Sequence, residues 1–328
     1  MRRISTHLEK LGANVQIVTT QPLTEESLLR AMTFRPEIVH AFHALKAGVV
    51  ALEIAKKLSV PLVVTITGTD VHSDLHHPER REIVLRVLRS ANAITTFAPA
   101  IADELAAVDI SLAAKTHIIP QGVWFPPQES WDVRKHLGIS AFVPLLLLPA
   151  NIRKVKRPML AFEGVGLLRK RGFDAHILFV GEILEAEEWE RLKAAIEKCQ
   201  WAHYLGSVPM ERMVSVYLAA GIVLNTSEHE GGMANALLEA MWLRRPVLAS
   251  AVAGNLSLVR HEETGLLFSD AGELAKQAEK LLADANLSER LVQNAYDWVH
   301  RNCDPIKEAQ SYLEVYSGFV GQIHERVM

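Results

Sequence analysis

A glycine pair lying between two glutamates is the part of this sequence whose residue types and spacing most directly predict chemistry. Residues 226–232 form a polar loop that ends in Gly231 and Gly232, after an apolar run at 221–225 and before an apolar helix expected from about Met233. Glycine lets an anion approach the backbone closely, and the N–H groups at the start of a helix attract phosphate. A strand, a glycine loop and a helix in this order predict a phosphate-binding loop.

Glu239 lies inside that helix, among apolar residues on nearly every side. The pattern predicts a largely buried helix, in which a carboxylate is costly unless a hydrogen-bonding group satisfies it. The hydroxyl groups of a ligand could supply those hydrogen bonds. The ordinary alternative is a glutamate on a solvated helix face.

A cluster of cations follows a second apolar strand, expected at residues 144–150. Four of them fall within five residues: Arg153, Lys154, Lys156 and Arg157. Guanidinium and ammonium groups just beyond the carboxyl end of a strand suit a diphosphate. The alternative is a solvated run of surface charge.

Strands and helices alternate along the rest of the chain, which predicts a parallel α/β fold. We expect strands near 15–19, 37–40, 61–67, 93–97, 116–119, 175–181, 203–206 and 221–225, and helices at 24–33, 44–58, 78–90, 158–171, 185–198, 271–283, 287–301 and 307–319. The first expected helix ends near Gly12, ahead of any strand. The polar, proline-containing run from Pro126 to Ser140 predicts a linker, so we expect the domain boundary near Val143.

Composition excludes several classes of function. The 328 residues are 49% hydrophobic and 22% charged with a net charge of −3, which provides no overall field for nucleic acid or an anionic membrane. Two cysteines, Cys199 and Cys303, form no disulfide framework. Apolar runs are far shorter than the ~20 residues of a membrane span. These features predict a cytoplasmic protein.

The glycine loop and its flanks resemble the donor-binding signature of the retaining GT-B glycosyltransferases, the glycosyl transferases group 1 family (family four). The family pattern is E-G-F-x-x-x-x-x-E-A-M, then P-V, then a G-G-x-x-E-x-V turn. One extra residue separates Glu230 from Glu239 here, and a glycosyltransferase 1 domain-containing subgroup with the same S-E-x-G-G-M-A loop favours a one-residue bulge. The residues in register are Glu230, Gly231, Gly232, Glu239, Ala240, Met241, Pro246, Val247, Gly254, Val259, Thr264, Gly265 and Leu266.

The resemblance implies two Rossmann-like domains with helices on both faces of parallel sheets. We expect an acceptor-side domain at 1–142, a donor-binding domain at 143–304, and a C-terminal helix at 305–328 that packs back on the first domain. It also implies a metal-independent hexosyltransferase that needs no cofactor and uses a UDP- or GDP-linked sugar as its donor. The acceptor, a sugar, lipid or small molecule, is not specified, and no nucleic acid is involved.

By the same resemblance, Arg153 and Lys156 bind the donor diphosphate and Glu230 binds the transferring sugar, so these three are the expected catalytic residues. Lys154 and Arg157 are expected to face solvent. Glu239 is expected to bind the ribose hydroxyls. The rest of the expected donor site comprises Gly231, Gly232, Met233 and Ala234, and the base-reading turn Gly206, Ser207 and Val208.

On the acceptor side, His43 and Lys46 resemble an H-x-x-(K/R) step of the family, and Gly68, Thr69 and Asp70 resemble its H-G-T-D-V turn. Thr67 replaces the histidine of that turn. A metal site built from Asp70, His72 and His76 is an alternative, because two histidines at i and i+4 share a helix face. The family needs no metal, so we expect none.

Three further interpretations stay open. The family has a central strand before its first helix, so we expect this sequence to begin downstream of such a strand. The arginine-bearing helix at 78–90 is interpreted as a solvated face, with peripheral membrane contact as the alternative. A nucleotide-sugar-binding protein without turnover, or a GT-B epimerase, is the rival to a transferase.

Overall fold

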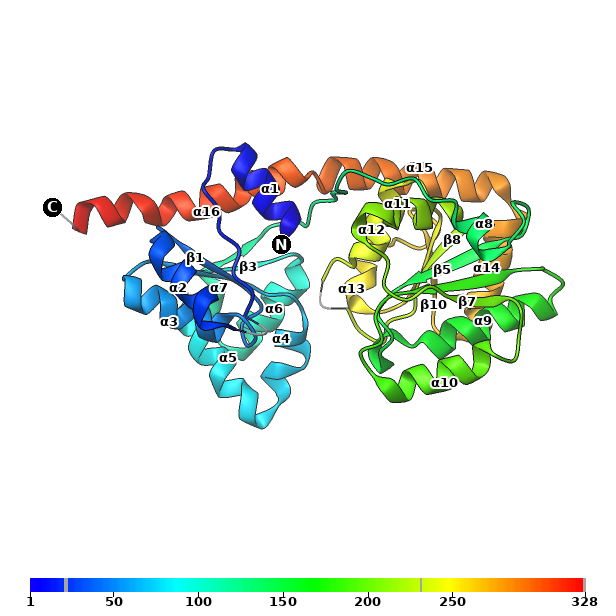
Figure 1. Cartoon of the computed structure of the whole chain (residues 1–328), viewed down its shortest axis with the longest axis horizontal. Helices are drawn as coiled ribbons and strands as arrows, with labels where there is room; N and C mark the ends of the chain where they lie inside the picture. The colour runs from blue at the N-terminus through cyan, green and yellow to red at the C-terminus, as the bar shows by residue number, and fades with distance from the viewer. Residues whose placement is uncertain (21–22, 231, 327–328) are drawn as a thin grey trace. The chain divides into compact units, whose positions relative to one another are not determined.

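The computed structural model describes residues 1–20, 23–230 and 232–326, with side chains as far as Val320. The chain divides into two compact units (Figure 1). Unit 1 comprises Met1–Gly122 and Cys303–Met328, and unit 2 comprises Val123–Asn302. Both chain ends therefore belong to unit 1.

The predicted boundary near Val143 is wrong, because the expected linker packs on unit 2. Its backbone and side chains hydrogen-bond along helix α11 (Met210–Ala219): the Trp131 N–H donates to Ser215 Oγ at 3.2 Å, and Arg134 Nε donates to the Ala219 carbonyl at 2.9 Å. The segment also contains a short helix, α8 (Val133–Leu137). These contacts make it the first part of unit 2.

Unit 1 is built on a four-stranded parallel sheet whose strands lie in chain order. The strands are β1 (Val39–Phe42), β2 (Leu62–Thr65), β3 (Ala93–Thr96) and β4 (Thr116–Ile118). The helices are α1 (Arg2–Lys10), α2 (Glu25–Phe34), α3 (Gly48–Leu58), α4 (Thr69–His72), α5 (Pro78–Ser90), α6 (Pro99–Val108), α7 (Ile110–Ala113) and α16 (Pro305–Arg326), with a 3₁₀ turn at Asp74–His76. Every residue of β2 and β3 is buried, as expected of inner parallel strands.

The last helix, α16, packs against the first helix, α1 (Figure 1). Arg3 donates to both carboxylate oxygens of Glu308, at 2.7 and 2.9 Å, and the Glu308 side chain is 1% exposed. Ile4, Leu8 and Tyr312 form a small apolar cluster beside this ion pair. The returning C-terminal helix is therefore confirmed.

Three local predictions for unit 1 differ from the structure. The extended run at 15–19 is not a strand, because within the described residues no neighbouring strand hydrogen-bonds with it. The strand expected at 37–40 is β1, two residues later. The helix expected from Ala44 begins at Gly48, because His43 has a φ of 89° and the chain turns there before it can enter a helix.

Unit 2 is built on a six-stranded parallel sheet with the order β10-β9-β8-β5-β6-β7. The strands are β5 (Leu145–Pro149), β6 (His176–Val180), β7 (Ala202–Tyr204), β8 (Ile222–Asn225), β9 (Val247–Ser250) and β10 (Leu266–Phe268). The further helices are α9 (Pro158–Lys170), α10 (Ala186–Ile196), α12 (Asn235–Trp242), α13 (Ala253–Leu256), α14 (Ala271–Ala283) and α15 (Ala285–Asn302), with a 3₁₀ turn, η2, at Lys154–Lys156.

The order of this sheet reverses at β5. From β5 the chain proceeds outwards to β6 and β7, and it then returns to place β8 on the other side of β5 before continuing to β9 and β10. Leu145–Leu148 of β5 are at most 2% exposed, as a central strand requires. Open α/β sheets bind ligands beyond the carboxyl ends of the strands at such a reversal. The loops after β5 and β8 are therefore the place to look for a site.

The predicted class, parallel α/β with two Rossmann-like units, is confirmed. Among the described residues, no helix is long and apolar enough to cross a bilayer.

Candidate active site

The loops that follow β5 and β8 are hydrogen-bonded to each other. Thr226 Oγ1 donates to the Lys156 carbonyl at 2.5 Å, and the Glu228 N–H donates to the Val155 carbonyl at 2.8 Å. Thr226 is fully buried, so this contact is shielded from water. We call the loop after β5, with its cations at 153–157, the cation loop, and the loop after β8 the glycine loop. The two loops consequently form one connected structure at the sheet reversal.

Arg157 strengthens this connection, which the sequence analysis did not predict. Its Nε donates to the Thr226 carbonyl at 2.7 Å and its Nη2 to the Ser227 carbonyl at 3.1 Å. The prediction that Arg157 faces solvent is wrong, because its guanidinium binds carbonyl groups of the glycine loop. Lys154 is exposed, as predicted.

Lys156 and Glu230 form an ion pair at the centre of the two loops. Lys156 Nζ lies 2.5 Å from Glu230 Oε1, which also accepts hydrogen bonds from Asn225 Nδ2 at 3.0 Å and Ser227 Oγ at 2.6 Å. Burial acts to raise the pKa of Glu230, but the Lys156 charge and these hydrogen bonds outweigh it and lower that pKa. Glu230 is therefore held as a carboxylate with three donors.

A buried polar network holds in place the side chains that donate to Glu230. Asn225 Oδ1 accepts from the Ser227 N–H at 3.0 Å, Ser250 Oγ donates to the Ser227 carbonyl at 2.6 Å, and Asn255 Nδ2 donates to Ser250 Oγ at 3.1 Å. All four side chains belong to residues that are at most 5% exposed. The sequence analysis missed this network. Its signal was the polar residue that ends each of two otherwise apolar strands, β8 and β9.

The local backbone explains two glycines near Glu230. A Cβ on Gly254 would lie 2.4 Å from the Glu230 carbonyl oxygen and 2.5 Å from its Cβ, so the chain at Gly254 can approach only without a side chain. Gly232 is buried with a φ of 149°, a backbone conformation that favours glycine. Gly231, predicted to bind the donor, lies outside the described residues.

Arg153 stands at the rim of these loops. Its Nε lies 3.6 Å from Glu185 Oε1, and the two side chains are 36% and 43% exposed. A pair this open contributes little to stability and leaves the guanidinium able to exchange partners. Arg153 and Lys156 thus lie on one loop, and of these two residues Lys156 is the one whose side chain contacts the glycine loop.

Glu239 is half-buried on α12, whose neighbouring residues Leu238 and Ala240 are buried, as expected of a largely buried helix. Tyr217 Oη, from α11, donates to Glu239 Oε2 at 2.6 Å. Burial raises the pKa of Tyr217 well above its usual value, and the Glu239 charge raises it further, so Tyr217 stays protonated and continues to donate. Sequence reasoning did not find Tyr217, because a tyrosine in an amphipathic helix usually fills the core.

The remaining donor-site predictions fall on backbone turns. Gly206 has a φ of 70°, and its carbonyl accepts from the Gly181 N–H at 2.9 Å, which ties the turn with Ser207 and Val208 to the end of β6. Helix α12 begins at Asn235, two residues after the start predicted at Met233, and its N-cap residue is Ala234, which makes no side-chain hydrogen bond. The side chain of the N-cap residue therefore does not satisfy the N–H groups at the amino end of α12.

In unit 1, His43 is buried and held in one tautomer. Its Nδ1 accepts from the N–H groups of Leu45 and Lys46, both at 3.2 Å, so its proton lies on Nε2, which is 2.9 Å from Thr69 Oγ1. Asp74 Oδ2 lies 3.7 Å from the same Nε2. Burial lowers the pKa of His43 by more than the nearby carboxylates raise it. His43 is therefore neutral, with an N–H to donate.

The Asp70 carboxylate shapes the turn at residues 67–70. Asp70 is fully buried, and its carboxylate accepts from the backbone N–H groups of Ala44, Thr67 and Gly68. Gly68 has a φ of 118°, which explains the glycine in this turn. Lys46 is exposed. Asp70 is thus unavailable to the alternative metal site, and no group of three or more metal-ligating side chains occurs in the described part of the chain.

Two parallel α/β units, one with a cation loop and a glycine loop at its strand reversal, define the GT-B class of glycosyltransferase fold. The family model described as "Glycosyl transferases group 1" matches residues 129–298, more than half of the chain, and the model "Glycosyl transferase 4-like domain" matches residues 7–122. The chain belongs to the glycosyl transferases group 1 family, as its sequence motifs predicted.

Similar proteins cover most of the chain. It is 30% identical over 310 residues to "Glycosyltransferase 1 domain-containing protein 1" of Xenopus tropicalis, covering 92% of this chain and 88% of that protein. It is 23% identical over 288 residues to "N-acetyl-alpha-D-glucosaminyl L-malate synthase" of Bacillus anthracis, covering 85% and 74%. Among solved structures, HepE of Anabaena in complex with UDP-glucose is similar with a TM-score of 0.77 at 20% identity, covering 96% of this chain and 89% of HepE.

Proposed function

We propose that this protein transfers a sugar from a UDP- or GDP-linked donor to an acceptor, with retention of anomeric configuration and without a metal ion. The observation that carries the proposal is the Lys156–Glu230 pair, placed by two hydrogen-bonded loops at the sheet reversal of unit 2. A cation beside a polar carboxylate at this point suits a ligand that joins an anionic diphosphate to a hydroxyl-rich sugar.

The chemistry assigned to unit 2 is electrostatic. Charge develops on the diphosphate as the sugar leaves, and preorganised donors aimed at that charge contribute much of the rate acceleration. Lys156, Arg153 and the amino end of α12 would supply these donors. Lys156 would exchange part of its contact with Glu230 for a phosphate oxygen, which frees one carboxylate oxygen of Glu230 for the sugar hydroxyls.

Glu239 is assigned to the ribose of the donor. Its partner Tyr217 fixes one carboxylate oxygen, so the carboxylate is held in a single orientation. The turn Gly206–Val208 is assigned to the base. Support for a nucleotide-sugar donor comes from HepE, whose structures were solved in complex with UDP and with UDP-glucose.

The acceptor is assigned to unit 1, to His43, Lys46 and the turn at Gly68–Asp70. Because His43 Nδ1 is occupied by two backbone N–H groups, His43 can donate from Nε2 but cannot take a proton there. His43 is thus assigned to hydrogen-bond an oxygen of a substrate, not to act as a general base.

The test is incubation of the purified protein with UDP-glucose, UDP-N-acetylglucosamine and GDP-mannose, each with and without a panel of sugar acceptors. We expect release of the nucleoside diphosphate from one donor and an α-linked product from an α-linked donor, measured by chromatography and NMR. Addition of a chelator should leave the rate unchanged. Thermal stabilisation by UDP or GDP with no turnover of any donor would instead identify a binding protein.

A further inference from the structure

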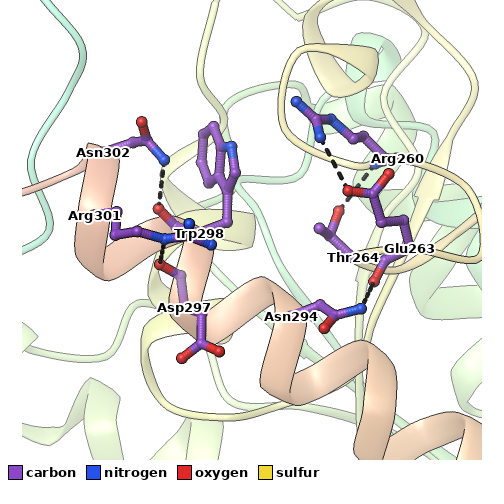
Figure 2. A pocket seen from close by; sticks show the side chains of 8 residues that line it. All are labelled: Arg260, Glu263, Thr264, Asn294, Asp297, Trp298, Arg301 and Asn302. Atoms are coloured by element: carbon purple, nitrogen blue, oxygen red, sulfur yellow. Dashed lines mark hydrogen bonds and ion pairs between the residues drawn. The ribbon is translucent and has the colours of Figure 1, made fainter.

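A polar cavity of about 360 Å³ lies on unit 2, between the second half of α15 and the loop 260–264 (Figure 2). That loop precedes β10, at the amino end of the parallel sheet, whereas the candidate active site lies beyond the carboxyl ends of β5 and β8. The cavity is therefore separate from the donor site. Its volume is at the lower end of the range typical of small-molecule sites.

One face of α15 forms the first wall. Asn294, Trp298 and Asn302 are spaced four residues apart and therefore project from the same side of the helix. Figure 2 shows the Trp298 indole between Asn302 and Arg260, with Arg260 on the opposite wall. Trp298 is half-buried, so the cavity offers a large aromatic surface partly shielded from water.

The polar groups of this face are oriented by contacts with the backbone. Asn294 Nδ2 donates to the Glu263 carbonyl at 2.9 Å and Asn302 Nδ2 to the Trp298 carbonyl at 2.8 Å, which leaves both amide oxygens as acceptors. Arg301 uses Nε to donate to the Asp297 carbonyl at 3.0 Å. In the described ranges, its terminal nitrogens and the Trp298 N–H have no protein partner and are available as donors.

The charges around the cavity are balanced. Arg260 Nη1 pairs with Glu263 Oε1 at 2.9 Å, and Arg301 shares the rim with the Asp297 carboxylate. A phosphate would meet two carboxylates and a cation would meet two guanidinium groups. A neutral ligand with several hydroxyls avoids both charge repulsions and can use both the donors and the acceptors.

We propose that this cavity binds a neutral saccharide unit, with one face of the sugar ring packed on Trp298 and its hydroxyls bound to Arg301 and the two asparagine oxygens. The site goes beyond sugar transfer: it would bind a carbohydrate whether or not a donor is present. An enzyme acting on a glycan could use it to hold a part of the chain remote from the reaction.

The test is fluorine NMR on the full chain labelled with 5-fluorotryptophan, titrated with glucose, N-acetylglucosamine and maltose without nucleotide. The Trp298 signal is identified by its loss in Trp298→Phe. We expect at least one sugar to shift this signal saturably in the millimolar range, and Arg301→Met to weaken that binding about tenfold, as loss of hydrogen bonds to a charged group predicts. Arg191→Met, an exposed arginine on α10 away from the cavity, should bind as the parent does.

Three results would overturn the proposal. One is a Trp298 signal that none of the three sugars shifts. Another is a signal shifted by inorganic phosphate but not by any of the sugars, which would make the cavity an anion site. The third is equal sugar affinity in Arg301→Met and Arg191→Met, because the Arg301 guanidinium would then not contact the ligand. None of these measurements depends on transferase activity.

Discussion

Replacing Lys156 with methionine tests the centre of the candidate active site, and Lys154→Met on the same 3₁₀ turn is its matched control. Lys156 is 26% exposed and lies 2.5 Å from Glu230, which is 12% exposed. Breaking a fully buried pair costs about 3–5 kcal/mol. Because Asn225 and Ser227 still donate to Glu230 and Lys156 is partly solvated, we expect a loss of about 2 kcal/mol.

The loss is measured by thermal unfolding of unit 2. For a domain of this size, about 2 kcal/mol lowers the Tm by roughly 4–8 °C. Lys154→Met should leave the Tm nearly unchanged, since Lys154 is exposed. If sugar transfer is established, Lys156→Met should also lower kcat by about 100-fold or more, as expected for a group that stabilises transition-state charge.

The pH dependence makes the test sharper. In the parent protein the pKa of Glu230 is lowered, so its contribution to stability is present above the ordinary value of 4.5 and is lost as the pH falls. In Lys156→Met the Glu230 pKa should rise, because burial is then opposed only by neutral donors. The difference in Tm between the parent protein and Lys156→Met should therefore be smaller at pH 4 than at pH 7. A difference independent of pH, or an equal loss in Lys154→Met, would refute this reasoning.

Three further outcomes are expected. Tyr217→Phe removes the donor that orients Glu239 and should raise the donor KM about tenfold with little change in kcat; an unchanged KM in steady-state assays would contradict this role. Gly254→Ala would place a Cβ 2.4 Å from the Glu230 carbonyl, and we expect a loss of about 1–3 kcal/mol in denaturant unfolding together with lower turnover. Burial lowers the pKa of His40 to about 3 from 6.5, so the unfolded chain binds the extra proton and stability falls as the pH drops below 6.5. His40→Gln should remove up to about 3 kcal/mol of the stability difference between pH 6.5 and 4, a change visible in Tm against pH.

Much of the fold could be predicted from the sequence because inner parallel strands are continuous apolar runs. The run at Leu145–Leu148 is a clear case, and it predicted the central strand of unit 2. The run at 15–19 also contains apolar β-branched residues, but it is not a strand. An extended segment becomes a strand only when a neighbour pairs with it, and a local pattern carries no information on the neighbour.

The candidate site could be predicted only in part. The cations after β5 and the glycine loop after β8 were found because each group is contiguous in the sequence. The role of Arg157 was missed because its partners, the carbonyls of Thr226 and Ser227, belong to a loop almost seventy residues away. Tyr217 was missed because a tyrosine in an amphipathic helix usually fills the core, and its contact with Glu239 joins two separate helices. Contacts of this kind depend on how strands are ordered, which periodicity does not reveal.

The pairing of α16 with α1 implies an order of events during synthesis. A ribosome completes all of unit 2 before it makes the residues that cover Ile4 and Leu8, so unit 2 can fold while unit 1 still lacks its last helix. A premature stop after Asn302 would leave a finished unit 2 attached to an uncovered unit 1. Such a truncation at the end of the chain would therefore expose apolar side chains of α1, at its beginning.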